Sequence, residues 1–522
     1  MSLNNIIKNA LISVSNKTNI INVAQLLIDN KINLFSTGGT EKTLKENNIP
    51  VTKISDYTEF PEIMDGRVKT LHPKIMAGIL GRRNIDKKIM HKYNILPIDI
   101  VIVNFYPIVK KNTKTSIKIS DFLNHIDIGG PTLVRAAAKN YKDVIIITDL
   151  SDFQSIINDI STNNITLEKR FYLAHKAFQY TLSYEKKIEQ YFSENITLKN
   201  NNAFPKILNL QFIKKQNLRY GENPHQKASY YIEKNTYLDG TISSSYQIQG
   251  KELSYNNISD ADIALECVQE FNDPACVIVK HGNPSSVSMK NSVYEAYLSA
   301  YHADTISAFG GVIAFNRILD VATLETIINN QFVEVIIATD IDNTALKILK
   351  TKKNIRVLIS GKKNKKTTGL DLKRIRNGLL VQEYDNNSIE YDKWTVKTVR
   401  HPTKNEIQDA LFCWKVAKFV KSNAIVYGRN NVTISIGAGQ TSRIDAINIA
   451  NMKAKKEKKN IIGATMSSDA FFPFRDGVDC ASLMGINCIV QPGGSIRDPE
   501  VIEAANEKNI SMIFTHTRHF KH

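Results

Sequence analysis

Cysteine is scarce in this chain, and the few cysteines present form no recognisable framework. The 522 residues include five of them: Cys267, Cys276, Cys413, Cys480 and Cys488. None belongs to a CxxC pair, and an odd, scattered set is typical of buried thiols in a reducing compartment. The sequence therefore predicts neither a disulfide framework nor a zinc framework.

Long apolar runs are also missing. No stretch approaches the roughly 18 apolar residues that a membrane-spanning helix needs. The opening residues, MSLNNIIKNALISVS, lack the uninterrupted apolar region and the cleavage site of a signal peptide. We therefore expect a cytoplasmic protein with no membrane partner.

Metal-binding signatures are equally sparse. His516, His519 and His522 lie close together at the end of the sequence, but no carboxylate accompanies them and no HExxH motif occurs. The H-x-E and P-C-x-x-C signature of zinc deaminases is missing too. We expect chemistry that requires no metal.

Acidic residues are outnumbered by basic ones. The chain has 68 Lys and Arg against 51 Asp and Glu, a formal net charge of +17. A basic surface attracts phosphate whatever its source, so RNA binding is one alternative. The basic runs at 362–366 and 453–459 have no interleaved aromatics, and a positive field also favours small anionic substrates. We expect small-molecule substrates and no nucleic acid.

Apolar runs and helical patterns alternate over residues 10 to 150. The helical spacing of Ile20, Val23, Leu26 and Leu27 follows the first apolar run. This alternation predicts an α/β domain with a parallel sheet, whose ligands bind at the carboxyl ends of the strands. The expected strands are short and rich in β-branched residues: 10–15, 32–37, 98–107 and 143–149.

A chain of this length predicts two to four domains. Residues 151–200 have a helical, polar pattern that ends in the Asn-rich, Pro-terminated segment 198–205. We place the boundary there, which gives domains at 1–200 and 201–522.

Two candidate phosphate loops follow the first two expected strands. The segment 13–18 offers hydroxyls and a cation where a helix begins, and the segment 36–40 offers two glycines at the next helix start. A Ser/Thr/Gly turn is also simply how strands meet helices, so either loop alone is a weak signal. The residues concerned are Ser13, Ser15, Lys17, Ser36, Thr37, Gly38, Gly39 and Thr40.

Further polar residues gather around the remaining strand ends of the first domain. The segment 64–80 presents Arg67, Lys69, Thr70 and His72 before a proline, although a solvated loop would hold the same charges. Arg135 and Lys139 lie four apart, so they share a helix face, which an exposed cationic stripe would also explain. Asn104, Tyr106 and Asp127 complete this set.

The second half contains its own polar motifs. RYGENPHQ (219–226) combines hydrogen-bonding groups with Gly221 and Pro224, which suits a rigid loop around a polar ligand. A buried strand run stops at Lys280 and His281, before a Gly/Asn/Pro turn, where rigidly held side chains face a cleft. Both features are also compatible with a plain turn and a polar strand end. The other candidates are Gly310, Glu334, Asn423, Arg443, Phe471, Asp476 and Arg518.

Taken in this order, the motifs resemble those of the bifunctional AICAR transformylase and IMP cyclohydrolase family, almost from end to end. The carrying segments are GRVKTLHP, RYGENPHQ and SDAFFPFRDG. The resemblance implies a methylglyoxal synthase-like domain, with its core at about 1–150, followed by a transformylase region of duplicated cytidine deaminase-like α/β folds. The chain departs from the family at Asn16 and Asn19, where Asp and Gly are usual, and at Ser285 and Ser286, where Cys and Gly are usual.

The resemblance also implies the chemistry. The 5-amino group of the aminoimidazole carboxamide ribotide (AICAR) takes a formyl group from the cosubstrate 10-formyltetrahydrofolate, and the product (FAICAR) closes to IMP. For formyl transfer, His281 is the implied base, supported by Lys280 and Asn423. For ring closure, the implied residues are Lys69, Tyr106, Asp127 and Lys139, with Lys139 as proton carrier. A homodimer is also implied.

The remaining candidates are implied to bind substrates: the two phosphate loops, Arg67, Thr70 and Asn104 in the first half, and Arg219, Tyr220, Gly310, Glu334, Arg443, Phe471, Asp476 and Arg518 in the second. A methylglyoxal synthase-like regulatory or lyase module joined to an unrelated binding domain is the second alternative. The motifs of the second half argue against it.

Overall fold

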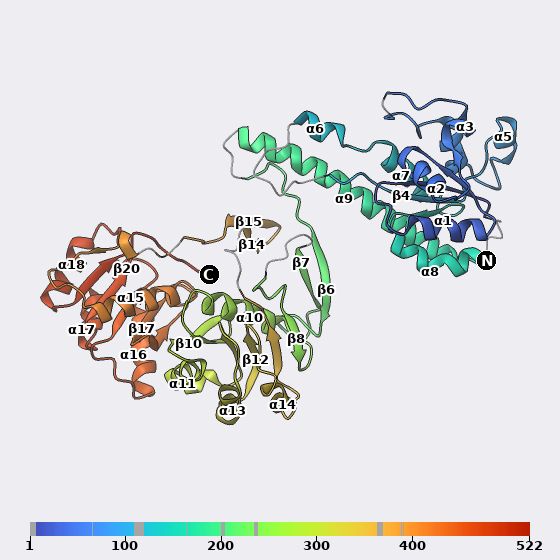
Figure 1. Cartoon of the computed structure of the whole chain (residues 1–522). Helices are drawn as coiled ribbons and strands as arrows, with labels where there is room; N and C mark the ends of the chain where they lie inside the picture. Colours follow the sequence, from blue (N-terminus) through green and yellow to red (C-terminus); the bar gives the residue numbers. More distant parts are fainter. Residues whose placement is uncertain are drawn as a thin grey trace. The chain divides into compact units, whose positions relative to one another are not determined.

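The computed structural model describes residues 7–64, 66–108, 119–162, 164–199, 204–233, 239–362, 369–387, 389 and 391–522. The chain divides into two compact units, Met1–Leu210 and Gln211–His522 (Figure 1). Each unit has its own buried apolar clusters.

The first unit is built on a five-stranded parallel sheet in the order β3-β2-β1-β4-β5. Its strands are β1 (Asn9–Val14), β2 (Asn33–Ser36), β3 (Thr52–Lys53), β4 (Ile100–Asn104) and β5 (Ile145–Ile147). Its helices are α1 (Ile20–Asp29), α2 (Gly38–Glu46), α3 (Ile54–Thr58), α4 (Pro73–Leu80), α5 (Lys87–Lys92), α6 (Ile119–Asn124), α7 (Gly129–Lys139), α8 (Leu150–Ser161) and α9 (Leu167–Lys199).

The four strands expected from the sequence are confirmed, and so is their parallel arrangement. They form because their β-branched side chains are buried on both faces: Ile100 to Val103 are at most 1% exposed. Helix α1 buries Ile20, Val23 and Leu27, as its spacing predicts. The short strand β3 was not predicted, because two residues carry no periodicity.

The strand order places a topological switch between β1 and β4. From β1 the chain moves outward through β2 and β3, and then returns to the other side of β1 for β4 and β5. In open parallel sheets, ligands bind at such a switch, beyond the carboxyl ends of the strands. The fold therefore points to the ends of β1 and β4.

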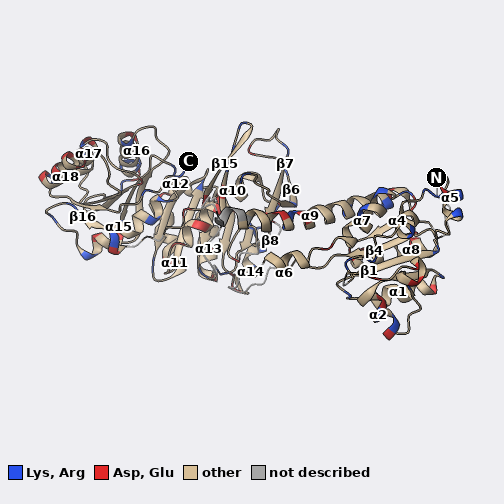
Figure 2. Cartoon of the chain, turned by 90° about the horizontal axis from the view of Figure 1, so that it is seen from above, with Lys and Arg blue, Asp and Glu red and all other residues tan. Residues whose placement is uncertain are grey.

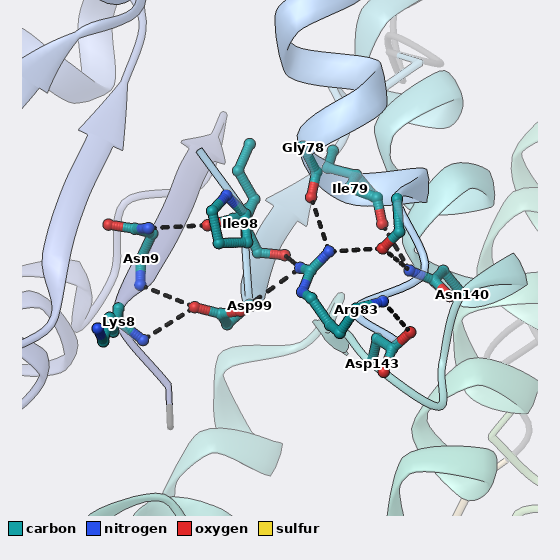
Figure 3. Close-up of polar contacts among 11 residues, drawn as sticks. Lys8, Asn9, Gly78, Ile79, Arg83, Ile98, Asp99, Asn140 and Asp143 are labelled. Atoms are coloured by element: carbon teal, nitrogen blue, oxygen red, sulfur yellow. Dashed lines mark hydrogen bonds and ion pairs between the residues drawn. The ribbon is translucent and has the colours of Figure 1, made fainter. Parts of the chain in front are cut away.

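The opposite, amino edge of this sheet is closed by a buried polar network (Figure 3). Asp99 Oδ2 accepts hydrogen bonds from the backbone N–H groups of Lys8 and Asn9 at 2.8 and 3.1 Å, and Arg83 Nη2 lies 3.4 Å from Oδ1. Arg83 also donates to the carbonyls of Gly81 and Ile98. Burial raises the pKa of Asp99 above its ordinary value. This network joins β1, α4 and β4 on the side away from the switch.

The second unit centres on a 12-stranded sheet, and it also contains two separate hairpins. The hairpins are β6 (Phe212–Leu218) with β7 (Ala228–Glu233) and β14 (Leu370–Ile375) with β15 (Gly378–Glu383). The first part of the sheet region comprises β8 (Tyr246–Gln249), α10 (Tyr255–Val268), β9 (Ala275–Lys280), β10 (Asn283–Met289), α11 (Val293–Ala303), α12 (Thr305–Ala308), β11 (Gly311–Phe315), α13 (Val321–Asn330), β12 (Val333–Ala338), α14 (Ala345–Leu349) and β13 (Arg356–Ile359).

The second part of the sheet region follows a 3₁₀ turn at Tyr391–Lys393. It comprises β16 (Thr395–Val396), α15 (Lys404–Ala417), β17 (Ile425–Arg429), β18 (Val432–Gly437), α16 (Arg443–Lys456), β19 (Thr465–Ser468), α17 (Asp476–Leu483), β20 (Cys488–Gln491), α18 (Asp498–Glu507) and β21 (Ser511–Phe514).

The predicted duplication is visible in the strand order. Outward from the central pair, the first half runs β10-β9-β11-β12-β13-β8 and the second runs β18-β17-β19-β20-β21-β16. The parallel and antiparallel pairings are the same at each step. The unit is therefore two copies of one α/β fold joined through β10 and β18, and most positions of one half have a counterpart in the other.

One local expectation was wrong. The segment after His281 was expected to be a Gly/Asn/Pro turn at residues 282–284. The turn is instead His281–Gly282, and β10 begins at Asn283, with a bulge between Pro284 and Ser286. The replacement of Cys and Gly by Ser285 and Ser286 therefore affects a strand bulge, where Ser285 Oγ donates to Ile278 O at 3.1 Å.

Basic and acidic side chains both occur on helices of the chain (Figure 2), but helix α7 carries only basic ones and helix α18 only acidic ones. Helix α2, by contrast, carries the ion pairs Lys45–Glu41 and Lys42–Glu46. In the part of the chain that the structure describes, no helix has the length and apolar character needed to cross a membrane.

Candidate active sites

The first candidate site lies at the switch between β1 and β4. Asn104, the last residue of β4, accepts hydrogen bonds at Oδ1 from the N–H groups of Ser15 and Asn16 at 2.7 and 2.9 Å, and its Nδ2 donates to Asn16 O at 3.0 Å. The loop after β1, with Ser13, Ser15 and Lys17, is thereby fixed to the neighbouring strand end.

The second loop leads into α2. Thr37 is the N-cap, and Gly38 has φ +47°, a left-handed conformation that favours glycine. The first N–H groups of a helix have no intrahelical partner, so they are available to an anion. The hydroxyls of Ser36 and Thr40 are buried and bond to the β1 backbone, at Ile12 O and Val14 O. In this structure those two side chains shape the loop.

Two lysines approach the start of α2. A Cβ added to Gly39 would lie 3.6 Å from Lys17 Nζ, and one added to Gly38 would lie 3.5 Å from Lys69 Nζ. Two cations beside a helix N-terminus make a positive site suited to a phosphate. The structure thus brings together Lys17 and Lys69, which are 52 positions apart in the sequence.

The start of α7 forms the other wall. Asp127 Oδ1 accepts from the N–H of Gly130 at 2.9 Å, and the N–H of Asp127 donates to Tyr184 Oη at 2.8 Å. A Cβ on Gly129 would lie 2.6 Å from Thr70 Oγ1, so the segment carrying Lys69 and Thr70 packs closely against this helix start.

Tyr106 and Arg67 lie at the exposed part of this region. Tyr106 lies two residues beyond the end of β4 and is 53% exposed. Arg67 is also exposed, and its Nη2 donates to Asn124 Oδ1 at 2.7 Å. His72 caps α4, accepting from the N–H of Lys74 at Nδ1, and so supports the same loop structurally.

Lys139 lies at the other end of α7 from the Asp127 side of this cluster. It is the last residue of α7, whereas Asp127 lies just before the first. The 11 residues of this helix place its ends about 15 Å apart along the axis. Lys139 and Arg135 are exposed, as expected for one helix face, and the Arg135 guanidinium lies 5.9 Å from the Phe178 ring centroid.

The two departures from the family in this loop have local explanations. Asn19 is the N-cap of α1 with φ +62°, a region that Asn tolerates better than most residues with a side chain. Asn16 Oδ1 accepts from the N–H and hydroxyl of Thr18 at 3.0 and 2.8 Å, as an Asp carboxylate also would. Both replacements preserve the turn.

The second candidate site, in the other unit, begins at the turn after β9. His281 has φ +52° and is exposed, and its N–H and that of Gly282 donate to the Asp260 carboxylate at 3.2 and 2.8 Å. Burial raises the pKa of Asp260, while these two hydrogen bonds oppose the rise. Lys280 Nζ donates to Phe309 O at 2.8 Å, immediately before Gly310.

Glu334 on β12 lies in the same region. Its Oε2 accepts a hydrogen bond from Asn257 Nδ2 at 2.8 Å. Its negative charge contributes to the raised pKa of Asp260. Asn257 also completes the capping box of α10 with Ser254. The structure therefore gathers Lys280, His281, Gly310 and Glu334 around the first turns of α10.

Asn423 and Arg443 are in direct contact. Arg443 Nη2 donates to Asn423 Oδ1 at 2.8 Å, and Asn423 Nδ2 donates to Gln440 O at 2.8 Å. This second group is tied to the first because the N–H of Lys421 donates to Asn283 Oδ1 at 3.0 Å. Residues from both halves of the duplicated unit thus meet at one place.

The RYGENPHQ loop closes on itself. The N–H of Gly221 donates to Gln226 O at 2.7 Å, and the N–H of Asn223 donates to Gln226 Oε1 at 2.8 Å. Asn256 Nδ2 links the loop to α10 through Glu222 O at 3.3 Å. Arg219 lies 5.7 Å from the Tyr220 ring centroid, at the start of the loop.

The three phenylalanines of SDAFFPFRDG have different environments. Phe472 is 1% exposed and belongs to the core, whereas Phe471 and Phe474 are 38% and 47% exposed. Asp476 begins α17. In the C-terminal tail the Arg518 guanidinium lies 4.1 Å from the Phe520 ring centroid, and His519 Nδ1 bonds to Asp385.

Asp260 and Lys421 were not predicted from the sequence as site residues. The contact between Asp469 and Arg443 was not predicted either. An Asp in the middle of a helical pattern carries no signal of its own, because its partners are 21 and 22 positions away.

Each unit is an α/β fold with a cluster of polar and charged side chains at its strand ends, an arrangement typical of enzymes that bind small anionic ligands. The sequence pattern of the family described as "AICARFT/IMPCHase bienzyme" matches residues 137–453, and that of the MGS-like domain matches residues 19–132.

Two relatives carry the name "Bifunctional purine biosynthesis protein PurH". The one from Buchnera aphidicola subsp. Acyrthosiphon pisum (strain Tuc7) is 65% identical over 526 residues, and the one from Buchnera aphidicola subsp. Schizaphis graminum (strain Sg) is 64% identical over 526. Each match covers 100% of both chains. The crystal structure of ForH is 31% identical, covering 35% of this chain and 96% of that one, with a TM-score of 0.33.

The chain belongs to the AICARFT/IMPCHase bienzyme family. It is a bifunctional enzyme of purine biosynthesis, with AICAR formyltransferase and IMP cyclohydrolase activities, and it carries out the last two steps of IMP formation.

Proposed function

We propose that the two activities are divided between the two units: Met1–Leu210 closes the ring of FAICAR, and Gln211–His522 transfers the formyl group to AICAR. The observation that carries this proposal is the presence of a separate polar cluster in each unit. One is the Lys17, Lys69 and Asp127 cluster at the sheet switch. The other is the Lys280–His281 turn with Asn423.

In the first unit, the loops after β1 and β2 hold the ribotide phosphate. Lys17 and the start of α2 supply positive charge, and Asn104 keeps the β1 loop in place. Arg67 and Thr70 contact the remainder of the nucleotide. Ser13, Ser15, Ser36, Thr37, Gly38, Gly39 and Thr40 form the walls of this phosphate site.

Ring closure requires help with protons and with charge. The carboxamide nitrogen of FAICAR attacks the formyl carbon and loses one proton, and the formyl oxygen gains one to become a hydroxyl. The hydroxyl then leaves as water with the proton of the formamide nitrogen, and the C=N bond of the ring forms. An amide nitrogen is a poor nucleophile, so a donor must stabilise the developing oxyanion. We assign this work to Lys69, Tyr106 and Asp127, with Lys139 as proton carrier. Because Lys139 lies at the far end of α7, its role requires that a second copy of the chain supply it.

In the second unit, the 5-amino group of AICAR attacks the formyl carbon of 10-formyltetrahydrofolate. The amine proton passes to His281, and N10 of tetrahydrofolate leaves with a proton. Lys280 stabilises the oxyanion, and Asn423 orients the carboxamide. The other proposed contacts are Arg219, Tyr220, Gly310, Glu334 and Arg443 for the ribotide, and Phe471, Asp476 and Arg518 for the folate.

The exposed rings of Phe471 and Phe474 support a folate site, because a pterin binds between apolar walls with a few polar contacts at its edge. We further propose that the enzyme is a cytoplasmic homodimer whose partners are small molecules. Five free cysteines, four of them buried, are in keeping with a reducing compartment.

The test is to measure the two half-reactions separately on His281→Ala. A positioned general base contributes roughly 10²–10⁴-fold, so formyl transfer should fall by about that factor. Conversion of FAICAR to IMP should be unchanged, because that site lies in the other unit.

A fall of less than about tenfold would make His281 a structural turn residue and move the base elsewhere. Cyclisation by a fragment ending near residue 200 is the complementary test of the division. A folded but inactive fragment would count against the assignment of ring closure to the first unit.

A further inference from the structure

Asp469 is a wholly buried carboxylate that follows β19. Its Oδ1 accepts from Arg443 Nη1 at 2.6 Å and from the N–H of Ala424 at 3.1 Å, and the residue is 0% exposed. Among the described residues, its Oδ2 has no hydrogen-bond partner. Arg443, 8% exposed, is therefore the ion-pair partner that balances this charge in the described part of the chain.

Arg443 in turn fixes the amide of Asn423. A guanidinium only donates hydrogen bonds, so the Asn423 atom facing Arg443 Nη2 must be the oxygen. The amide nitrogen then faces Gln440 O, where it uses one of its two N–H groups. One N–H of Asn423 remains to meet a substrate, in an orientation set by Arg443.

The duplicated fold provides a comparison for Asp469. In the first half, Asn316 follows β11 as Asp469 follows β19, and its Oδ1 accepts from the N–H of Ala275 at 2.9 Å. The two donors occupy equivalent positions. Ala275 precedes Cys276, which pairs with Phe315 at the end of β11. Ala424 precedes Ile425, which pairs with Ser468 at the end of β19. The fold therefore needs only an acceptor at this position, and an amide is sufficient.

What distinguishes the second half is the charge. Asp469 keeps the structural hydrogen bond and also balances Arg443, for which the first half has no equivalent: Val293 begins α11 where Arg443 begins α16. We propose that Asp469 is a positioning residue for formyl transfer, which holds Arg443 against Asn423 and so sets the orientation of the Asn423 amide. This inference rests on the proposed role of Asn423.

The test compares Asp469→Asn, Asn423→Ala and the double variant, with formyl transfer and cyclisation measured on each full-length protein. Asp469→Asn should fold, because Asn316 performs the same structural task. It should lower kcat for formyl transfer by about 10- to 100-fold, by analogy with the loss of a residue that orients a metal ligand. In the Asn423→Ala background the same change should have an effect of less than about threefold.

Asp409→Asn is the matched control, since Asp409 is a buried carboxylate of the same unit that bonds to the turn N–H of Asn431. It should leave kcat unchanged. The proposal would be overturned if Asp469→Asn lowered formyl transfer equally in the wild-type and the Asn423→Ala proteins. It would also be overturned if Asp469→Asn abolished cyclisation or cooperative melting, because an Asn would then not be sufficient for the fold. Unchanged formyl transfer in Asn423→Ala would instead refute the role of Asn423 itself.

Discussion

The backbone N–H of Ser15 donates a hydrogen bond to Oδ1 of Asn104 at 2.7 Å, at the point where the strand order of the first unit reverses. The loop that follows β1 is therefore positioned by the side chain that ends β4. The Asn104 side chain therefore holds the loop of the proposed phosphate site in place. This structural role does not depend on a contact between Asn104 and the ligand.

Asn104→Ala removes the hydrogen bonds to Ser15 and Asn16. Each contributes about 1 kcal/mol, so the KM for FAICAR should rise by about tenfold or more. Steady-state cyclisation kinetics will measure this. Asn140→Ala is the matched control, because Asn140 Nδ2 bonds to Ile79 O at the other edge of the sheet. It should lower the melting temperature and leave KM unchanged, and equal KM values in the two variants would contradict the assignment.

Lys139→Ala should let FAICAR accumulate while formyl transfer continues, as chromatography of the reaction mixture would show. Because Lys139 lies about 15 Å along α7 from the Asp127 end, we expect a second chain to supply it. Mixing Lys139→Ala with Lys69→Ala chains should then restore part of the cyclisation, since some sites would receive both lysines. No recovery after subunit exchange would place Lys139 in the same chain's site or outside catalysis.

Asp260 and Asp409 form a second matched pair. Asp260 accepts from the turn N–H groups of His281 and Gly282, and Asp409 accepts from that of Asn431 in the equivalent turn. Replacing either carboxylate by the amide of Asn should lower the melting temperature, because an amide oxygen is a weaker acceptor for the N–H groups of the turn. Only Asp260→Asn should reduce formyl transfer, since its turn carries His281. Equal activity of the two variants would show that the turn does not need Asp260.

The raised pKa of Asp99 predicts a pH dependence of stability. A carboxyl whose pKa is higher in the folded than in the unfolded chain binds protons more tightly when folded. Its contribution is therefore present below the usual value of 3.8 and is lost as the pH rises through the folded pKa. Melting temperatures of wild type and Asp99→Asn between about pH 3.5 and 6 should show the wild type losing stability relative to the variant. A difference that stays constant would refute the shift.

Local patterns in the sequence were sufficient to predict the elements that carry the sites. The run Ile100 to Val103 is buried on both faces, so its side chains alone indicate an interior parallel strand. Lys280 and His281 were placed correctly at a strand end, because the apolar run stops there. Motif resemblance added the expectation, still a proposal, that ring closure belongs to the first half of the chain and formyl transfer to the second.

Contacts between distant segments were beyond such reasoning. Asn104 braces a loop 88 and 89 positions away, and Asp469 meets Arg443 across 26 positions. The periodicity of a helix or strand contains no information about these pairs, because the sheet order decides which strand ends become neighbours. The distance along α7 that separates Lys139 from Asp127 likewise became evident only when the helix bounds were known.

The left-handed backbone at His281 lowers the stability of the folded chain more than the left-handed residues of the equivalent turn between β17 and β18 do. In the turn between β17 and β18, Asn430 and Asn431 have φ +54° and +58°. In the turn after β9, His281 has φ +52°. Most residues with a Cβ are disfavoured there by about 1 kcal/mol or more, Asn tolerates the region better than most of them, and Gly is free of that penalty. His281→Gly should therefore yield an enzyme that melts at a higher temperature yet transfers formyl groups poorly. A screen for stability alone would then replace the histidine, and the proposed role of His281 in formyl transfer would explain why this turn keeps a less stable residue.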